Sequence, residues 1–310
     1  MNTLILTPDG VGSTILQRLI TMALYLEKIP VINTHELTNG LVLKNNVANK
    51  DFNLGYTQTL DQIINILNKS YKDTQLVSRL AKYHLDSRKD ALLKQEKFFS
   101  FLNNFYQKKI MCVRENIFEY AMSWSIRHKS GVLNVYGRQD REKVIQVSEV
   151  DENYFIKKCQ EYVDYQLWIE QYFPDVEKIS YEKLVTDSDT VVEQLIGYKN
   201  TFKNAFNMSL SSLLRIEYQF FNSLTLKNTQ QTLTKEEQKA LFLYKSYSNS
   251  LIKKGIILGH PIKNTTLEDK MKQIKNFNQC LKKFYSFAKN HNWIDQSNAT
   301  YDFWNKKHIC

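Results

Sequence analysis

The residues best suited to chemistry near the start of the chain form a glycine-rich turn. Residues 4–7, which are apolar or β-branched, indicate a short buried strand before it, and an apolar stripe over about residues 14–27 indicates a helix after it. The turn contains Gly10, Val11, Gly12, Ser13 and Thr14. Glycine permits unusual backbone angles, and serine and threonine suit the cap and first turn of a helix. Such a turn directs backbone N–H groups and a helix dipole towards one point, which predicts a phosphate or sulfate site. The same residues also fit an ordinary, capped strand-to-helix turn.

A second candidate for anion binding is Arg114, which follows a strand predicted over residues 109–113. Its planar guanidinium matches phosphate oxygens in geometry and in charge. Ser123 follows on a helix predicted over residues 116–128, and a turn between the two would bring its hydroxyl to the same phosphate. A structural role is the alternative, in which Arg114 pairs with a carboxylate such as Glu119 and Ser123 is buried in the helix.

Acid–base groups occur where two further strands are predicted to end. His84 closes a strand predicted over residues 76–84, with Lys82 two residues before it. Glu36 lies in the loop predicted after a strand at residues 30–33. A histidine or a carboxylate can remove a proton from a hydroxyl, and a lysine can stabilise developing negative charge. Structural roles are the alternatives: His84 would be a histidine hydrogen-bonded to the backbone, and Glu36 would be a solvated acid in a loop.

The elements that would position these residues alternate between strands and helices. This predicts an α/β fold with a mainly parallel sheet flanked by helices, whose ligands bind beyond the carboxyl ends of the strands. The four segments above would then surround one crevice. Residues 1–200 are expected to form a nucleotide-binding α/β core, and residues 201–310 a largely helical extension packed on it. The other expected elements are helices at residues 59–70, 88–107, 151–172, 188–198, 202–222, 234–253 and 266–291, a strand at residues 175–180, and an irregular stretch at residues 130–150.

Composition narrows the class of protein. The chain has 310 residues, a formal net charge of +10 and four scattered cysteines. The cysteines show neither a zinc spacing nor a disulfide framework, and the first residues lack a signal-peptide pattern, which indicates a cytoplasmic protein without a metal. The positive charge suits a polyanionic ligand, but no motif of a specific nucleic-acid-binding module occurs. No apolar run is long enough to span a membrane, and no pattern specifies an oligomeric state.

Several of these segments resemble motifs of the sulfotransferases that use 3′-phosphoadenosine 5′-phosphosulfate. Leu-Thr-Pro-Asp-Gly-Val-Gly-Ser-Thr14 is similar to their 5′-phosphosulfate loop, and Cys-Val-Arg114-Glu-Asn-Ile-Phe-Glu-Tyr-Ala-Met-Ser123-Trp to their 3′-phosphate motif. The second segment looks most like the bacterial trehalose-sulfotransferase branch. Lys82-Tyr-His84-Leu85 is similar to the Lys-Thr-His-Leu segment of the cytosolic branch, and Ile-Ser-Tyr-Glu-Lys-Leu-Val185 to a later Tyr-Glu-x-Leu element.

The resemblance implies a P-loop type of fold and assigns roles to the residues above. The turn from Gly10 to Thr14 would hold the 5′-phosphate and the sulfate, and Arg114 with Ser123 would hold the 3′-phosphate. A sulfuryl group would pass to a hydroxyl of a small-molecule or carbohydrate acceptor, with adenosine 3′,5′-bisphosphate as the product. Two residues compete for the role of base. One is His84, with Lys82 near the sulfate; the other is Glu36, since the trehalose branch looks to use a carboxylate in the loop after the second strand.

The chain departs from this family at one position. The family loop carries a lysine or arginine that neutralises the bridging oxygen, and the alignment places Gly10 there, next to Asp9. Loss of a donor aimed at a transition state lowers a rate by about 10²–10³-fold. Either Lys82 or Arg18 substitutes, or the chain binds nucleotide with little turnover. A small-molecule P-loop kinase is a further alternative, although the Gly-Lys-Ser/Thr ending that holds the β- and γ-phosphates is missing.

Overall fold

The computed structural model describes residues 1–8, 10–27, 29–38, 59–70, 75–88, 91–132, 138–199 and 267–291. These residues fall into two compact units. One comprises Met1–Val113 and the described part of Ile169–Pro261, and the other comprises Arg114–Trp168 and the described part of Ile262–Cys310. The boundary expected at residue 200 lies at the end of a described stretch and stays a prediction. The helices expected over residues 202–222 and 234–253 lie outside the described residues.

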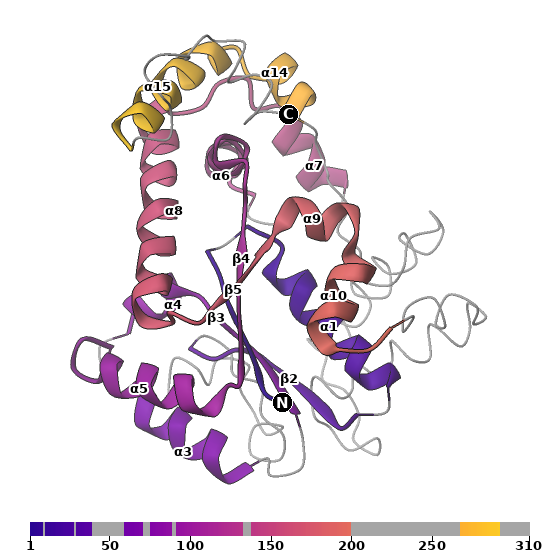
Figure 1. Cartoon of the computed structure of the whole chain (residues 1–310). Helices are drawn as coiled ribbons and strands as arrows, with labels where there is room; N and C mark the ends of the chain where they lie inside the picture. The colour runs from indigo at the N-terminus through magenta and orange to yellow at the C-terminus, as the bar shows by residue number, and fades with distance from the viewer. Residues whose placement is uncertain are drawn as a thin grey trace. The chain divides into compact units, whose positions relative to one another are not determined.

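The first unit contains a five-stranded parallel sheet in the order β2-β3-β1-β4-β5 (Figure 1). Its strands are β1 (Thr3–Leu6), β2 (Val31–Glu36), β3 (Gln75–Leu80), β4 (Lys108–Val113) and β5 (Glu177–Ser180). The central strand β1 is buried along its whole length, as expected of a parallel strand that is covered on both faces. The predicted α/β class with a mainly parallel sheet is therefore confirmed.

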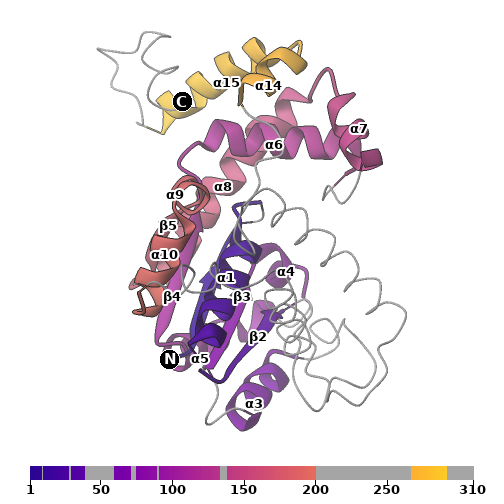
Figure 2. The same cartoon turned by 90° about the vertical axis from the view of Figure 1, so that its right-hand side faces the viewer.

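Helices cover both faces of this sheet. They are α1 (Ser13–Leu26), α3 (Leu60–Ser70), α4 (Lys82–Asp86), α5 (Ala91–Phe105), α9 (Tyr181–Thr186) and α10 (Ser188–Ile196). The pair α1 and α10 packs on one face, and the pair α3 and α5 on the other (Figure 1, Figure 2). Right-handed crossovers produce this division, because the chain moves one way across the sheet from β1 to β2 and the other way from β2 to β4. The carboxyl ends of β1 and β4 therefore form a switch point, where open parallel sheets bind ligands.

The second unit is helical wherever it is described. It contains α6 (Ile117–Ser130), α7 (Arg138–Ile145), α8 (Glu152–Tyr172) as far as Trp168, α14 (Leu267–Gln273) and α15 (Phe277–Asn290). Phe118 of α6 lies at its aromatic centre, with ring centroids of Phe155, Phe277 and Phe284 at 5.2, 5.1 and 5.5 Å. These edge-to-face contacts attach α15 to α6 and α8. Among the helices that the structure describes in either unit, none is long and apolar enough to cross a membrane.

Three segments differ from the sequence prediction. The stretch at residues 130–150, expected to be irregular, contains α7. The strand expected over residues 76–84 ends at Leu80, and α4 follows it, stabilised by an ion pair between Lys82 and Asp86 one turn apart. The single helix expected over residues 266–291 is interrupted before α15. There the Asn276 side chain donates to the Val150 carbonyl at 2.9 Å and accepts from the Val150 N–H at 3.2 Å.

Candidate functional site

The glycine-rich turn follows the carboxyl end of β1 and leads into α1. Gly10 and Gly12 have φ angles of 80° and 77°, in the left-handed region that favours glycine. α1 begins at Ser13, and the Leu16 N–H donates to the Gly12 carbonyl at 3.0 Å. The N–H groups that precede Leu16 have no acceptor within the helix, and the first turn of α1 contains no acidic residue. The turn therefore has the backbone geometry that favours an anion.

Two neighbouring elements hold this turn in place. Val11 is fully buried, and its carbonyl accepts a hydrogen bond from Sγ of Cys112 in β4 at 2.8 Å. The ring of Tyr181, the first residue of α9, lies so close to Gly12 that a Cβ there would be 2.7 Å from Cδ2 of the ring. Gly12 is thus required both by its φ angle and by this contact. The side chain of Thr14 lies outside the described residues.

Glu36 is the last residue of β2 and not a loop residue. Its buried carboxylate accepts through Oε2 from Nε of Arg79 in β3 and through Oε1 from the N–H of Ala81, each at 3.0 Å. The interpretation as a solvated acid is therefore wrong. The ion pair joins the carboxyl ends of β2 and β3, where the two residues are also register partners. Because both oxygens are engaged, a role as base would require one of them to be released.

Lys82 and His84 lie on α4, the short helix that follows β3 directly, and not on the strand as predicted. Lys82 forms its ion pair with Asp86. His84 is 7% exposed, and its ring centroid is 3.7 Å from that of Tyr83. Burial, followed by the positive charge of Arg79, lowers the pKa of His84 from 6.5 to about 4. The imidazole is therefore neutral near pH 7, which is the form that accepts a proton, although the low pKa makes it a weak base.

Arg114 and Ser123 both belong to the second unit. Arg114 is buried, and Tyr162 of α8 fixes its backbone, since the phenol accepts from the Arg114 N–H and donates to the Arg114 carbonyl at 3.0 Å. Ser123 of α6 accepts a hydrogen bond from Nζ of Lys270 in α14 at 2.9 Å. The same Nζ donates to Oε1 of Glu119, also at 2.9 Å. Glu119, which the sequence suggested as a partner for Arg114, thus forms an ion pair with Lys270.

The candidates of the first unit gather at one edge of the sheet, as expected from parallel strands. The glycine turn follows β1, Glu36 ends β2, and Lys82 and His84 follow β3. Arg114 and Ser123 belong to the second unit, where Arg114 contacts Tyr162 and Ser123 contacts Lys270. The observed arrangement can bind an anion at the turn, and it offers one neutral histidine and one lysine at the same sheet edge for proton transfer and charge stabilisation.

Three residues that shape these groups did not emerge from the sequence: Arg79, Tyr181 in its role against Gly12, and Lys270. A signal existed for Arg79, because a lone arginine in an apolar strand suggests a buried acid at the end of a neighbouring strand. No signal existed for Lys270, because 147 residues separate it from Ser123.

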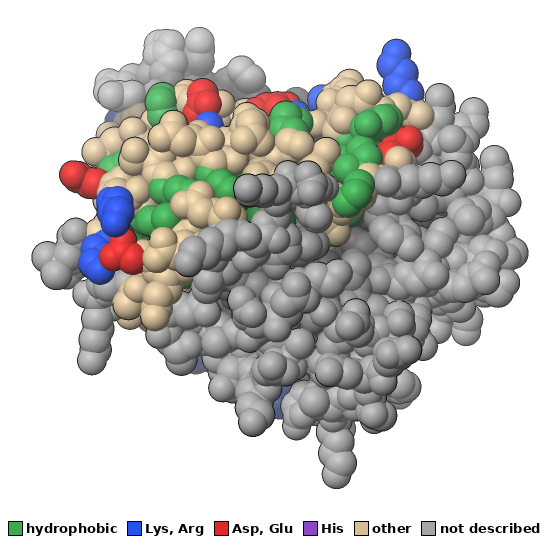
Figure 3. Space-filling view, turned by 90° about the horizontal axis from the view of Figure 1, so that it is seen from below, with side chains coloured by type: hydrophobic (Ala, Val, Ile, Leu, Met, Phe, Trp, Pro, Cys, Tyr) green, Lys and Arg blue, Asp and Glu red, His purple; other side chains and the backbone are tan. Residues whose placement is uncertain are grey.

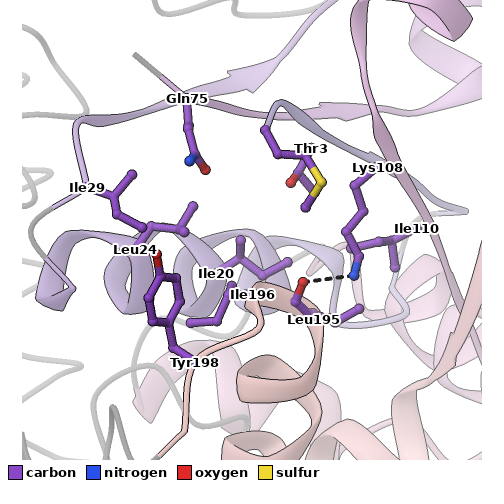
Figure 4. Close-up of a pocket in the computed structure, with 11 residues that line it drawn as sticks. Thr3, Ile20, Leu24, Ile29, Gln75, Lys108, Ile110, Leu195, Ile196 and Tyr198 are labelled. Carbon is purple, nitrogen blue, oxygen red and sulfur yellow. Dashed lines mark hydrogen bonds between the residues drawn. The ribbon is translucent and has the colours of Figure 1, made fainter. Parts of the chain in front are cut away.

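A cavity of about 100 Å³ lies at the opposite edge of the sheet, at the amino ends of β1, β3 and β4 (Figure 4). Its lining is mainly apolar and includes side chains of α1 and α10. Nζ of Lys108 donates to the Leu195 carbonyl at 2.8 Å and lies 3.3 Å from the Glu177 carboxylate. Figure 3 views this side from below and shows hydrophobic side chains reaching the surface among polar ones. The described lining includes no acid or histidine, and the ammonium group of Lys108 is held by the Leu195 carbonyl and the Glu177 carboxylate.

Comparison with known proteins gives no family for this chain. No protein-family model matches it, and no curated protein matches it either. Within the described stretches, no three histidine, cysteine or acidic side chains come together as a set that could hold a metal ion. A functional assignment therefore depends on the residues and their geometry.

Proposed function

We propose that this protein is a sulfotransferase that moves a sulfuryl group from 3′-phosphoadenosine 5′-phosphosulfate to a hydroxyl of a small-molecule or carbohydrate acceptor. The observation that carries the proposal is the glycine turn at the switch point of the sheet, followed by a helix with no acid in its first turn. Backbone N–H groups and the helix dipole there favour a 5′-phosphosulfate. The resemblance adds Arg114 and Ser123 for the 3′-phosphate, a P-loop type of fold and a cytoplasmic location.

In the proposed reaction the acceptor oxygen attacks sulfur, and adenosine 3′,5′-bisphosphate leaves with negative charge on the former bridging oxygen. Positioning and charge stabilisation dominate such transfers. His84 is a better candidate for the base than Glu36, because its imidazole is neutral whereas both oxygens of Glu36 already accept hydrogen bonds. Lys82 is the candidate cation, and its ion pair with Asp86 would be exchanged for the sulfate.

A second candidate function is nucleotide binding without transfer. It is favoured by Gly10, which stands where the resembling family has a cation and which has a positive φ angle. Introducing a lysine at Gly10 would add the cation, but a left-handed backbone costs a non-glycine residue about 1–2 kcal/mol. The loop conformation is therefore one that suits glycine better than the family's basic residue.

Thermal unfolding of the full chain with adenosine 3′,5′-bisphosphate tests binding, with ATP and Mg²⁺ as the comparison. At a hundred times its dissociation constant, a ligand specific for the folded state adds about 2.7 kcal/mol to the free energy of unfolding. Transfer of radiolabelled sulfate from the nucleotide to a panel of carbohydrates and small alcohols tests catalysis. Stabilisation with transfer supports the sulfotransferase, and stabilisation without transfer supports the binding protein. Stabilisation by ATP alone would contradict both and favour the kinase alternative.

A further inference from the structure

A buried ammonium group connects α14 to α6. Lys270 is 3% exposed, and its Nζ lies 2.9 Å from both Oε1 of Glu119 and Oγ of Ser123. The two acceptors are four residues apart on α6, so they lie on the same face of that helix and one ammonium reaches both. The contact therefore joins a distant part of the chain to the serine that the resemblance assigns to the 3′-phosphate.

The contact also determines how the Ser123 hydroxyl can act. An ammonium group is a donor only, so Ser123 accepts from Lys270 and its own hydrogen points elsewhere. A hydroxyl that accepts a hydrogen bond from a cation becomes a stronger donor, because hydrogen bonds in a chain polarise one another. The hydroxyl hydrogen of Ser123 can thus be donated to a further acceptor, such as an anion.

The buried, charged side chains of the second unit, among its described residues, are Arg114, Glu119 and Lys270. The Lys270 ammonium lies against the Glu119 carboxylate and the Ser123 hydroxyl. A phosphate bound beside Ser123 would come within reach of the same ammonium, and a charge-assisted hydrogen bond to phosphate is stronger than one to a neutral hydroxyl.

We infer that Lys270 is a third ligand of the 3′-phosphate, beside Arg114 and Ser123, and this inference rests on the proposed function. Without nucleotide, Glu119 and Ser123 hold the ammonium. With nucleotide, the ammonium is shared between Glu119 and a phosphate oxygen, while Ser123 donates to the same phosphate. No covalent step is involved. α14 is then part of the nucleotide site, and nucleotide binding stabilises its attachment to α6.

The test compares two nucleotides that differ only in the 3′-phosphate. Titration calorimetry on the full chain measures the dissociation constants of adenosine 3′,5′-bisphosphate and adenosine 5′-monophosphate. Lys270→Met would leave Glu119 buried without its cation, so the Lys270→Met, Glu119→Gln double variant is measured beside it. The matched control is Lys283→Met, which removes a partly exposed lysine of the same unit whose Nζ is 3.1 Å from Glu152.

Loss of a charge-assisted hydrogen bond to phosphate predicts that both Lys270 variants bind the bisphosphate about 10- to 100-fold more weakly. The dissociation constant of the monophosphate should stay as in the wild type. In Lys283→Met, the ratio of the two dissociation constants, bisphosphate to monophosphate, should also stay as in the wild type. A wild-type ratio in the folded double variant would overturn the inference and leave the proposed function standing. Binding of neither nucleotide by the wild type would overturn both.

A second measurement needs no variant. The bisphosphate, but not the monophosphate, should slow amide hydrogen exchange in Leu267–Gln273 of α14. Equal exchange with the two nucleotides, when both are bound, would also overturn the role of Lys270.

Discussion

Replacing Gly12 with alanine probes the glycine turn directly. The φ angle of 77° costs a non-glycine residue about 1–2 kcal/mol. The new Cβ would also lie 2.7 Å from Cδ2 and 3.0 Å from Cε2 of Tyr181, and overpacking of this kind costs about 1–3 kcal/mol. The expected loss in the free energy of unfolding is the sum of the two, about 2–5 kcal/mol. That is a large part of the ~5–15 kcal/mol that stabilises a typical domain.

Urea unfolding of the full chain, followed by circular dichroism, measures this loss. Gly197→Ala is the matched control in the same unit, because Gly197 has a φ angle of 80° and nothing within 4 Å of the position of a Cβ. The control should lose only the backbone contribution, about 1–2 kcal/mol. Adding Tyr181→Leu to Gly12→Ala should recover part of the extra loss. Equal destabilisation by Gly12→Ala and Gly197→Ala would refute the close contact with Tyr181.

Further predictions concern the acid–base groups. The pKa of His84 is lowered from 6.5 to about 4 in the folded protein, so the unfolded chain takes up the proton first as the pH falls. The free energy of unfolding should therefore decrease between pH 6.5 and about pH 4, by up to about 3 kcal/mol. His84→Gln should flatten the pH dependence of urea unfolding in this range, and an unchanged slope would count against the buried, neutral imidazole. If His84 is the base, the acid limb of kcat/KM should lie near pH 4. Glu36→Gln should lower the free energy of unfolding by about 2–4 kcal/mol, which is less than for a fully buried pair because Arg79 is partly exposed. Adding Arg79→Met to Glu36→Gln should recover most of this loss. Wild-type stability of Glu36→Gln would contradict the ion pair.

Much of the first unit was predictable because its elements have strong local patterns. The apolar stripe of α1 includes Leu16, Leu19 and Ile20, and all three are buried. The short elements were missed for the opposite reason. α4 has five residues, too few for a helical period, and an ion pair and a buried histidine stabilise it instead. α7 has the sequence RQDREKVI, whose apolar residues are confined to its end.

The candidate site divides in the same way. The turn was predictable, since the φ angles of Gly10 and Gly12 are a local requirement that only glycine meets readily. The ion pair of Glu36 with Arg79 and the contact of Lys270 with Ser123 depend on residues that are 43 and 147 positions apart. Such pairs are selected by the packing of elements that the sequence alone does not arrange in space.

The thiol of Cys112 is fully buried and donates to the Val11 carbonyl, so its reactivity reports on opening of the glycine turn. A cysteine-labelling reagent can reach this sulfur only in the brief intervals when the turn separates from β4, so the labelling rate counts those openings. Any anion that binds the closed turn would lower the labelling rate of Cys112 in proportion to the fraction of protein that is occupied. In a chain whose other cysteines are replaced by alanine, a single reaction rate would then report occupancy for ligands of any chemistry, without a catalytic assay.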